Sequence, residues 1–472
     1  MRKKKIIMKR IAAIQVFDFK NVKKGELEFK NNENYPYGSV LGLYGQNGSG
    51  KTALIEVLSL VKKVLCGQSV SLDFANHINV DAGFCKIVVQ FTIDEKEVHS
   101  DVEYSFKLKK EMIDKKSNLN SEVDGEEKAV IFDEVLSYAY NDDQKKIIKS
   151  KLIDTTNSAI FGPKSKYKSL VGTSKLDELN LMVAKKIVRN ESKSFIFSNE
   201  FLDVVRNRSK ECKDEEFLRH VHIIETLVYF ANHELFIIDT KNTGFISLGM
   251  LPLSFHVPEN ESKSIGPYMI PLEQVSLVSE LVFNKLNRII ENMNIVLQQL
   301  IPNLTIEIRK LGKELLKDNK IGYSVEFVSN KNGKSIPLKY ESEGVKKIIS
   351  ILQLLIEVYN QPSIVVAIDE LDAGIYEYLL GELLKIIGEQ GKGQLIFTSH
   401  NLRPLETINK KFVAFTTTDP ENRYVRLKNI AANNNLRDVY YRDIALNDDV
   451  YELTENAEIS HAFRKAGEMS GC

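Results

Sequence analysis

The sequence predicts an α/β protein with a parallel core sheet, and two observations support this prediction. Residues 39–44 form an apolar run that leads into a glycine-rich segment, and residues 52–65 have the apolar spacing of an amphipathic helix. Residues 363–368 form a second apolar run, which is followed by a helical pattern and by a third run at 394–398. Apolar strands that alternate with helices are typical of a parallel sheet covered on both faces.

The glycine-rich segment matches the phosphate-binding pattern G-x-x-x-x-G-K-[ST]. It consists of Gly45, Gln46, Asn47, Gly48, Ser49, Gly50, Lys51 and Thr52. Glycines let consecutive backbone N–H groups turn toward phosphates, and the start of the following helix adds its positive dipole. We expect Lys51 to reach the β- and γ-phosphates and the Thr52 hydroxyl to bind Mg²⁺. The segment therefore predicts a site for a nucleoside triphosphate and Mg²⁺.

The bulk composition is that of a globular protein and narrows the choice of partners. The 472 residues are 43% hydrophobic and 27% charged, and 64 basic residues balance 64 acidic ones. A net charge of zero gives no overall field to attract nucleic acid or an anionic membrane. The four scattered cysteines lack the spacing of a zinc site and fit free thiols in a reducing compartment. Because no stretch is long enough to cross a bilayer, we expect a cytoplasmic protein without membrane partners.

Alternating patterns predict an antiparallel subdomain beside the core. Residues 11–17 and 25–29 read as paired strands that precede the strand of the phosphate-binding loop. Lys20 and Lys23 lie between them, near the expected mouth of the site, where solvated turn lysines are the favoured interpretation. Further strands are expected at 85–93, 102–108 and 129–138.

The middle of the chain changes to helical spacing and predicts an inserted helical lobe. Residues 170–235 show this period, and Pro271 and Pro302 bracket an apolar stripe that predicts one long helix at 272–301. His220 and His222 alternate and lack a carboxylate pair, so a metal site there is disfavoured. Three strands follow, at 304–309, 322–328 and 334–338, and the last two are joined by a hairpin at Asn332 and Gly333.

These patterns divide the chain into four parts. Residues 1–145 are expected to form the first part of the nucleotide-binding core with the antiparallel subdomain, and 146–302 the helical lobe. Residues 303–425 are expected to complete the core. Residues 426–472 form a tail that mixes aromatic residues with arginines, so that a docking surface and ordinary core packing are equally compatible with it.

Two carboxylates and a histidine follow the second and third apolar strands. Asp369 and Glu370 end one strand, and His400 follows the other. The carboxyl ends of parallel strands face ligands in such sheets. We expect Asp369 to hold Mg²⁺, Glu370 to polarise the attacking water and His400 to reach the γ-phosphate.

The order of these segments resembles the ABC-type ATPase heads of the SMC-like class, and the resemblance covers nearly the whole chain. It implies a head with a parallel core sheet, an antiparallel β-subdomain and an inserted helical lobe. Asp369 and Glu370 would form Walker B, Asp372 would lie in the D-loop and His400 in the H-loop. The signature, which contacts the nucleotide of a second protomer in the family, would be Ser342, Glu343 and Gly344.

Two features depart from that family pattern. One glycine follows Glu343, where transporters usually have two, which disfavours a transporter and leaves Ser342 as a simple helix cap an open alternative. The glutamine of the Q-loop cannot be assigned securely, since Gln90 lies in an expected strand and Gln144 is a weak second choice.

The opening strands and the single interrupted head are similar to bacterial ATPases of OLD-like, abortive-infection and PARIS-type phage defence. This resemblance implies an ATP-sandwiched homodimer or higher oligomer that acts as the sensor or regulatory subunit of a defence system, triggered by DNA or a phage component. Residues 401–472 are too few for the nuclease domain of OLD-type proteins, so we expect a separate effector, a toxin or a nuclease.

Two other functions compete with this interpretation. A DNA-maintenance ATPase, similar to RecF or SMC-like repair proteins, would grip DNA directly and would present a basic face. The neutral net charge and the lack of long coiled-coil arms weigh against it. An ATP-dependent scaffold that does not hydrolyse ATP is disfavoured by Glu370.

Overall fold

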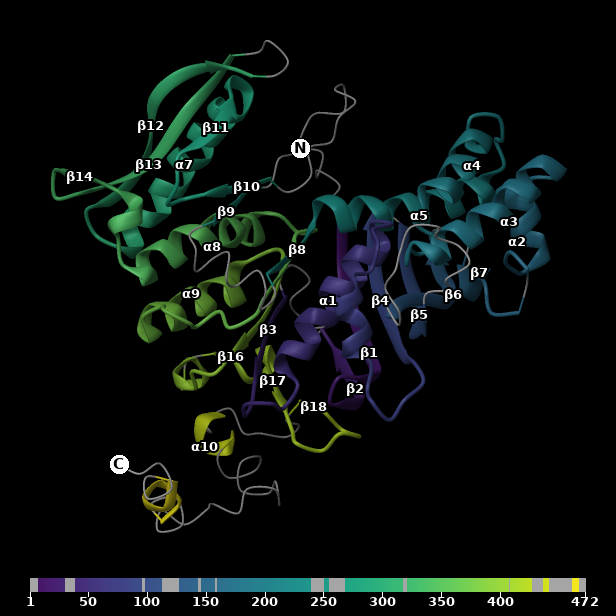
Figure 1. Ribbon diagram of the computed structural model, residues 1–472, viewed down its shortest axis with the longest axis horizontal. Coiled ribbons are helices and arrows are strands. Elements are labelled where there is room, and N and C mark those ends of the chain that lie inside the picture. Colours follow the sequence, from purple (N-terminus) through teal and green to yellow (C-terminus); the bar gives the residue numbers. More distant parts are fainter. Residues whose placement is uncertain are drawn as a thin grey trace.

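The computed structural model describes residues 7–29, 39–95, 98–112, 127–142, 146–157, 159–238, 250–253, 268–316, 321–406, 408–426, 436–440 and 461–466. Figure 1 shows a central sheet with helices on both faces, a unit of helices at one end of the molecule and a smaller sheet with its own helix at the other. None of the described helices combines the length and apolar composition needed to cross a membrane.

The central sheet has six strands in the order β18-β17-β3-β16-β15-β8. The neighbouring strands from β17 to β8 in this order are all parallel, and β18 pairs with β17 in the antiparallel sense. This confirms the α/β fold with a parallel core sheet. The strands are β3 (Ser39–Tyr44), β8 (Leu235–Ile238), β15 (Val365–Ile368), β16 (Gln394–Ser399), β17 (Val413–Thr416) and β18 (Tyr424–Val425).

Helices cover both faces of this sheet because side chains alternate along each buried strand. Leu41 and Leu43 of β3 pack into the cluster that contains α1 (Lys51–Leu65). Val40 and Tyr44 pack on the opposite side. That side is covered by α8 (Glu343–Asn360) and α9 (Glu377–Gln390). The carboxyl ends of β3, β15 and β16 therefore meet at one edge, between α1 and α8.

A six-stranded antiparallel sheet lies on the far side of α1 (Figure 1). Its order is β2-β1-β4-β5-β6-β7, and every neighbouring pair is antiparallel. The predicted antiparallel subdomain is thus present. The strands are β1 (Ile7–Phe19), β2 (Val22–Glu28), β4 (Cys85–Glu95), β5 (Val98–Met112), β6 (Glu127–Asn141) and β7 (Lys146–Asp154).

Four helices pack against this sheet and lead the chain back to β8. They are α2 (Lys164–Val171), α3 (Lys175–Asn190), α4 (Asn199–Ser209) and α5 (Glu215–His233). The residues before α3, α4 and α5 are Ser174, Ser198 and Asp214, and each side chain accepts a hydrogen bond from the backbone N–H three residues on. Such N-caps fix where each helix begins.

The helical period expected for residues 170–235 includes five large apolar side chains of α3, and these lie on the exposed side of the helix. Leu176, Leu179, Met182, Val183 and Ile187 are each at least 44% exposed. The buried side of α3 consists of Leu181, Ala184 and Val188 instead. The helical period was therefore correct for this segment, although the most apolar stripe does not face the core.

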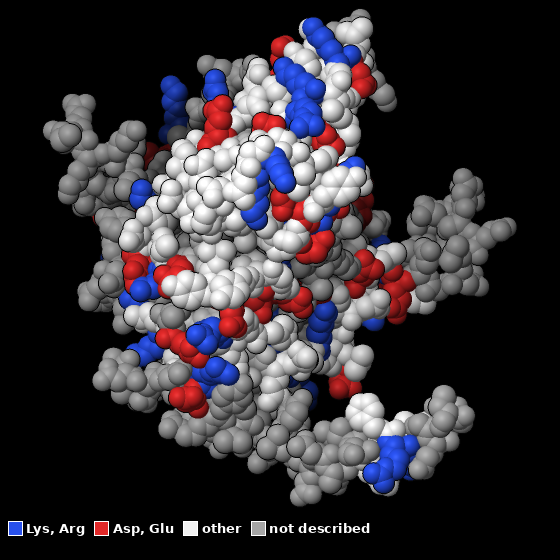
Figure 2. Space-filling view, turned by 90° about the vertical axis from the view of Figure 1, so that its left-hand side faces the viewer, with Lys and Arg blue, Asp and Glu red and all other residues white. Residues whose placement is uncertain are grey.

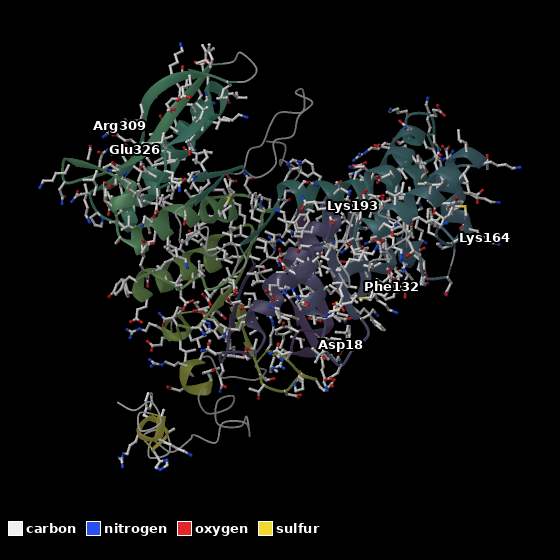
Figure 3. All side chains as sticks on the ribbon, viewed as in Figure 1. Asp18, Phe132, Lys164, Lys193, Arg309 and Glu326 are labelled. Atoms are coloured by element: carbon white, nitrogen blue, oxygen red, sulfur yellow. The ribbon has the colours of Figure 1, made fainter. Side chains whose placement is uncertain are left out.

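A second unit lies at the other end of the molecule. Its sheet has the order β11-β13-β12, with β14 also paired to β13, and α7 packs on it. Figure 3 marks its cross-strand neighbours Arg309 and Glu326, far from Lys164 at the start of α2. The elements are β9 (Met250–Leu253), β10 (Tyr268–Pro271), β11 (Ser276–Ser279), α7 (Glu280–Leu300), β12 (Leu304–Leu315), β13 (Ile321–Lys331) and β14 (Lys334–Pro337).

This unit differs from two of our expectations. The helix predicted at 272–301 spans 280–300, because residues 276–279 pair with β13 as a strand and the Ser279 hydroxyl caps α7. Residues 146–302 also do not form one helical lobe, since α2–α5 and α7 lie at opposite ends (Figure 1). The predicted hairpin is present: Asn332 and Gly333 have φ angles of 50° and 75° between β13 and β14.

Only part of the tail 426–472 lies within the described residues. Its helix α10 (Leu436–Tyr440) returns to the central sheet. The Tyr440 ring stacks on Phe415 of β17, with 5.4 Å between ring centroids. For this short part of the tail, core packing accounts for the aromatic residue.

Candidate nucleotide site

A pocket of about 360 Å³ lies at the carboxyl edge of the central sheet. It brings the phosphate-binding loop together with Glu370 and His400, which are more than 300 residues away in the chain. Lys20 and Asn21, from the turn between β1 and β2, close one side. The pocket is lined by Lys20, Asn21, Asn47, Gly48, Gly50, Lys51, Thr52, Ala53, Glu370 and His400.

The phosphate-binding loop has the backbone conformation that its glycines permit. Gly48 and Gly50 have φ angles of 75° and 96°, a region that residues with a Cβ rarely adopt. The Lys51 ammonium lies inside the loop and donates hydrogen bonds to the carbonyl oxygens of Gly45 (2.7 Å) and Gln46 (2.8 Å). Burial lowers the pKa of Lys51, although the nearby carboxylates oppose this shift. The cation is therefore already at the place where phosphate oxygens would need it.

Asp369 and Glu370 directly follow β15, beside this loop. The Asp369 side chain is fully buried, whereas that of Glu370 is 42% exposed toward the pocket. The Thr398 hydroxyl on β16 holds both residues: it donates to Oδ1 of Asp369 and accepts from the Glu370 backbone N–H at 2.8 Å. One side chain thereby fixes a buried carboxylate and a solvent-accessible one next to each other.

His400 follows β16 and faces Glu370 across the pocket. Its Nε2 atom lies 4.0 Å from Oε1 of Glu370. The backbone amide of His400 donates to the carboxylate of Asp372. Asp372 is not among the described residues that line the pocket. It contacts the backbone of His400 and not the imidazole ring.

Residues 342–344, the expected signature, lie at the start of α8. The Ser342 hydroxyl accepts from the Val345 backbone N–H at 3.4 Å, so it does cap the helix. Ser342 and Glu343 are exposed, whereas Gly344 is half-buried. None of the three lines the pocket formed by the described part of this chain. Capping accounts for the Ser342 hydroxyl, and a contact of residues 342–344 with a second protomer's nucleotide stays a prediction.

Several residues that support the loop were missed by the sequence analysis. The Thr416 hydroxyl on β17 bonds to the Ser49 hydroxyl, and the Tyr424 hydroxyl donates to the Gly50 carbonyl at 3.1 Å. Arg423, only 4% exposed, donates to the carbonyls of Asn21 and Thr417. These residues carry no recognisable motif, and nothing in local spacing places them next to a loop more than 360 residues earlier.

Three other expectations concern single residues. Lys20, for which a solvated turn was favoured, lines the pocket, and its ammonium pairs with Glu56. Gln90 is on β4, where its side-chain amide donates to Glu103, and it does not line the pocket. Gln144 lies outside the described residues.

The two histidines of α5 have other partners. His220 is buried, and its Nε2 lies 2.8 Å from the Tyr138 hydroxyl, whereas His222 pairs with Glu95. Within the described ranges, no three His, Cys, Asp or Glu side chains are grouped so that they could hold a metal ion. A Mg²⁺ ion at Thr52 and Asp369 would depend on phosphate oxygens for its remaining ligands, which suits a cation that binds together with nucleotide.

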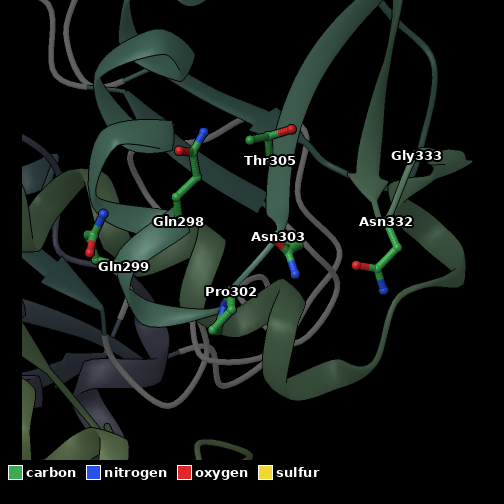
Figure 4. A pocket seen from close by; sticks show the side chains of 7 residues that line it. All are labelled: Gln298, Gln299, Pro302, Asn303, Thr305, Asn332 and Gly333. Carbon is green, nitrogen blue, oxygen red and sulfur yellow. The ribbon is translucent and has the colours of Figure 1, made fainter.

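A larger pocket of about 550 Å³ lies far from this site, between the end of α7 and the β13–β14 turn (Figure 4). Its lining consists of amide side chains, Thr305, Pro302 and Gly333. None of these side chains ionises or acts as a strong nucleophile. This second pocket therefore offers no general base or strong nucleophile for hydrolysis.

Comparison with known proteins gives one family and several solved structures. A family model described as an AAA ATPase domain matches residues 8–403. No curated protein matches the chain.

The chain is similar to solved structures of SMC head domains and of RecF. The Smc head domain bound to the C-terminal domain of ScpA, from Pyrococcus furiosus, is 13% identical over 89% of this chain and 97% of that chain, with a TM-score of 0.39. The SMC head domain from Thermotoga maritima is 12% identical over 89% and 99%, with a TM-score of 0.37. The recombination mediator protein RecF with ATP is 15% identical over 89% and 100%, with a TM-score of 0.36.

Proposed function

This chain belongs to the AAA ATPase domain family, and we propose that it is an ATP-driven switch in which two copies enclose ATP between them. ATP binding favours the closed pair, and hydrolysis removes the ligand that joins the two copies. A ligand that binds one state preferentially shifts the population toward that state.

One observation carries this proposal. Within the described chain, the pocket combines the phosphate-binding loop with Glu370 and His400, but residues 342–344 lie outside it and are largely exposed. A second copy related by a two-fold axis would present its own residues 342–344 to this pocket, and the same contact would occur twice. The exposed start of α8 then has a function that capping alone does not give it.

The roles of the residues follow from their positions. Lys51 would exchange its two carbonyl partners for phosphate oxygens, which are stronger acceptors because they are charged. The Glu370 carboxylate would accept a proton from the attacking water, and His400 would donate a hydrogen bond to the γ-phosphate. Mg²⁺, bound through the Thr52 hydroxyl and the Asp369 carboxylate, would neutralise charge on the phosphates.

For the biological role, we propose a sensor or regulatory subunit of an anti-phage system that controls a separate toxin or nuclease. The motif order and its resemblance to defence ATPases support this role. The alternative is a DNA-maintenance ATPase that binds DNA directly. Figure 2 shows acidic and basic side chains interspersed on one face of the molecule, without a continuous basic band. That distribution favours a protein partner on this face over the DNA backbone.

Two variants test the switch. Lys51→Ala removes the phosphate-binding cation and is expected to bind a fluorescent ATP analogue at least about 10-fold more weakly. Glu370→Gln keeps binding but lacks the base, so a dimer should accumulate with ATP and Mg²⁺ in light scattering coupled to gel filtration. Wild-type turnover by Glu370→Gln would remove this residue from its assigned role.

The biological role needs a second experiment. The chain is purified together with the products of its neighbouring genes, and ATPase activity is measured with and without duplex DNA. The defence proposal predicts a stable complex with one neighbour that changes between the ATP-bound and hydrolysed states. A chain that ignores every neighbour and hydrolyses ATP only with DNA would support the DNA-maintenance alternative.

A further inference from the structure

We propose that Lys347 positions Glu370 for hydrolysis and links it to the exposed start of α8. This inference rests on the proposed function, because it gives a role to the contact between residues 342–344 and a second copy. Lys347 touches neither the pocket nor the expected nucleotide, so it would act as a positioning residue.

The central observation is a hydrogen bond between a buried lysine and the backbone of Glu370. The Nζ atom of Lys347 donates to the Glu370 carbonyl oxygen at 2.9 Å. Lys347 is 6% exposed and lies in the second turn of α8, five residues after Ser342. The helix that carries the expected signature thus makes a direct contact with the expected general base.

Glu370 has a backbone conformation that needs such support. Its φ angle is 50°, in the left-handed region, which is unfavourable for a residue with a Cβ. The Thr398 hydroxyl accepts from the Glu370 N–H, and the Glu370 carbonyl accepts from the Lys347 ammonium and from the Ala373 backbone N–H at 3.1 Å. The peptide groups on both sides of Glu370 are therefore fixed by side chains, and the direction of its carboxylate depends on both contacts.

Packing alone does not account for a lysine at this position. Burial lowers the pKa of Lys347, whereas the charges of Asp372, Glu370 and Asp369 oppose that shift. Burying an ammonium group is costly, and an apolar side chain of similar volume often serves stability as well or better. A hydrogen bond to the base of the reaction is a functional reason for keeping the cation.

The start of α8 is packed closely enough to transmit a displacement. An ideal Cβ on Gly344 would lie only 2.5 Å from the Gly374 carbonyl oxygen, so the helix and the segment after Asp372 are in direct contact. The neighbouring Lys346 has different partners, Glu273 and Glu343. Since α8 is continuous from 343 to 360, a shift of its first turn by a second copy would move Lys347 and the Glu370 carbonyl with it.

The test compares two lysines that each donate to a backbone carbonyl, Lys347, which is buried, and Lys62, which is half-buried. Lys347→Met removes the contact to Glu370, and Lys62→Met is the matched control, because the Lys62 ammonium donates to the Leu235 carbonyl at 2.6 Å away from the pocket. We expect Lys347→Met to lower kcat by about 100-fold, the effect of misplacing a catalytic group by about 1 Å. The Kd for ATP and the unfolding midpoint should stay near wild type, and the ATP-bound dimer should accumulate. Lys62→Met should keep wild-type kcat.

Other outcomes separate this inference from the proposed function. If Lys347→Met does not fold, Lys347→Gln, which keeps a polar end that stops short of Glu370, is expected to show the same loss of kcat at unchanged Kd. A kcat within threefold of wild type in either folded variant, or an equal loss in Lys62→Met, would overturn the role of Lys347. A wild-type protein that neither hydrolyses ATP nor forms a dimer in its presence would instead overturn the proposed function.

Discussion

The Oδ2 atom of Asp372 lies 3.1 Å from the backbone nitrogen of His400 and accepts its hydrogen bond. The same oxygen accepts from the Asn401 backbone N–H at 2.8 Å. Asp372 follows β15 and His400 follows β16, which are neighbouring parallel strands. One carboxylate therefore joins the two loops that carry Glu370 and His400, and the 4.0 Å separation of their side chains depends on it.

We predict that Asp372→Ala lowers both stability and turnover. The His400 N–H loses its acceptor, whereas the Asn401 N–H keeps the Ser399 hydroxyl as an acceptor at 3.1 Å. This loss should cost about 1 kcal/mol of unfolding free energy, because water can replace part of the bond. The displaced His400 loop should lower kcat by at least about 10-fold at an unchanged Kd for ATP. Urea unfolding and steady-state ATPase assays measure the two effects. Asp372→Asn keeps an oxygen acceptor and should lie between wild type and Asp372→Ala; an unchanged kcat in Asp372→Ala would contradict the proposed dependence.

The buried histidine His220 predicts that stability falls with acid. Burial lowers the pKa of His220 from 6.5 to about 4, and Lys166 adds to this shift. The unfolded chain therefore binds a proton between pH 6.5 and 4 that the folded chain does not, so the unfolding free energy decreases as the pH falls through this window. From pH 7 to pH 5 we expect a loss of about 2 kcal/mol from this group.

The control for this prediction is His220→Gln, whose side chain does not titrate and can still bond to the Tyr138 hydroxyl. Urea unfolding of both proteins at pH 7 and pH 5 isolates the contribution of His220, because other titrating groups cancel in the difference. Equal losses in wild type and His220→Gln would show that His220 does not cause the acid sensitivity.

Truncation of two leucines of α3 should change the unfolding free energy by very different amounts. Leu181 is fully buried, whereas Leu179 is 58% exposed on the same helix. Leu181→Ala should lower the unfolding free energy by about 2–5 kcal/mol, since it leaves a cavity. Leu179→Ala should change it by at most about 0.5 kcal/mol. Chemical denaturation of the two variants tests the orientation of α3. A larger loss of unfolding free energy in Leu179→Ala than in Leu181→Ala would show that Leu179, and not Leu181, faces the core.

The parts of the fold that the sequence predicted are those with strong local patterns. Residues 40–44 and 364–368 are apolar because both faces of their strands are buried, and Gly48 and Gly50 of the phosphate-binding loop are required by their positive φ angles. Each of these signals lies within a few consecutive residues, and the strand at 39–44 directly precedes the phosphate-binding loop. The strand–loop–helix unit could therefore be identified without tertiary information.

The rest depended on contacts between distant segments. Residues 276–279 continue the apolar spacing of α7, and only their pairing with β13 makes them a strand. The most apolar stripe of α3 faces solvent, so hydrophobic period identified the helix but not its orientation. Likewise, Thr416 and Arg423 support the phosphate-binding loop through a hairpin far along the chain, which no local spacing could indicate.

Gly344 allows the closest approach between α8 and the segment after Asp372, and this predicts the effect of adding one methyl group. In Gly344→Ala the new Cβ would lie 2.5 Å from the Gly374 carbonyl oxygen, a distance that real Cβ atoms essentially never show, so the first turn of α8 must move. Displacing packed backbone should cost about 1–3 kcal/mol of unfolding free energy.

Because the same turn would contact a second copy's nucleotide, Gly344→Ala should also reduce the ATP-dependent dimer that Glu370→Gln accumulates. Gly312→Ala is the matched control, since a Cβ at Gly312 meets no atom within 4 Å and this glycine lies on β12, in another unit. Light scattering of both glycine variants in the Glu370→Gln background measures the dimer. A stable Gly344→Ala protein that dimerises as well as Gly312→Ala would show that the first turn of α8 tolerates displacement and does not determine association.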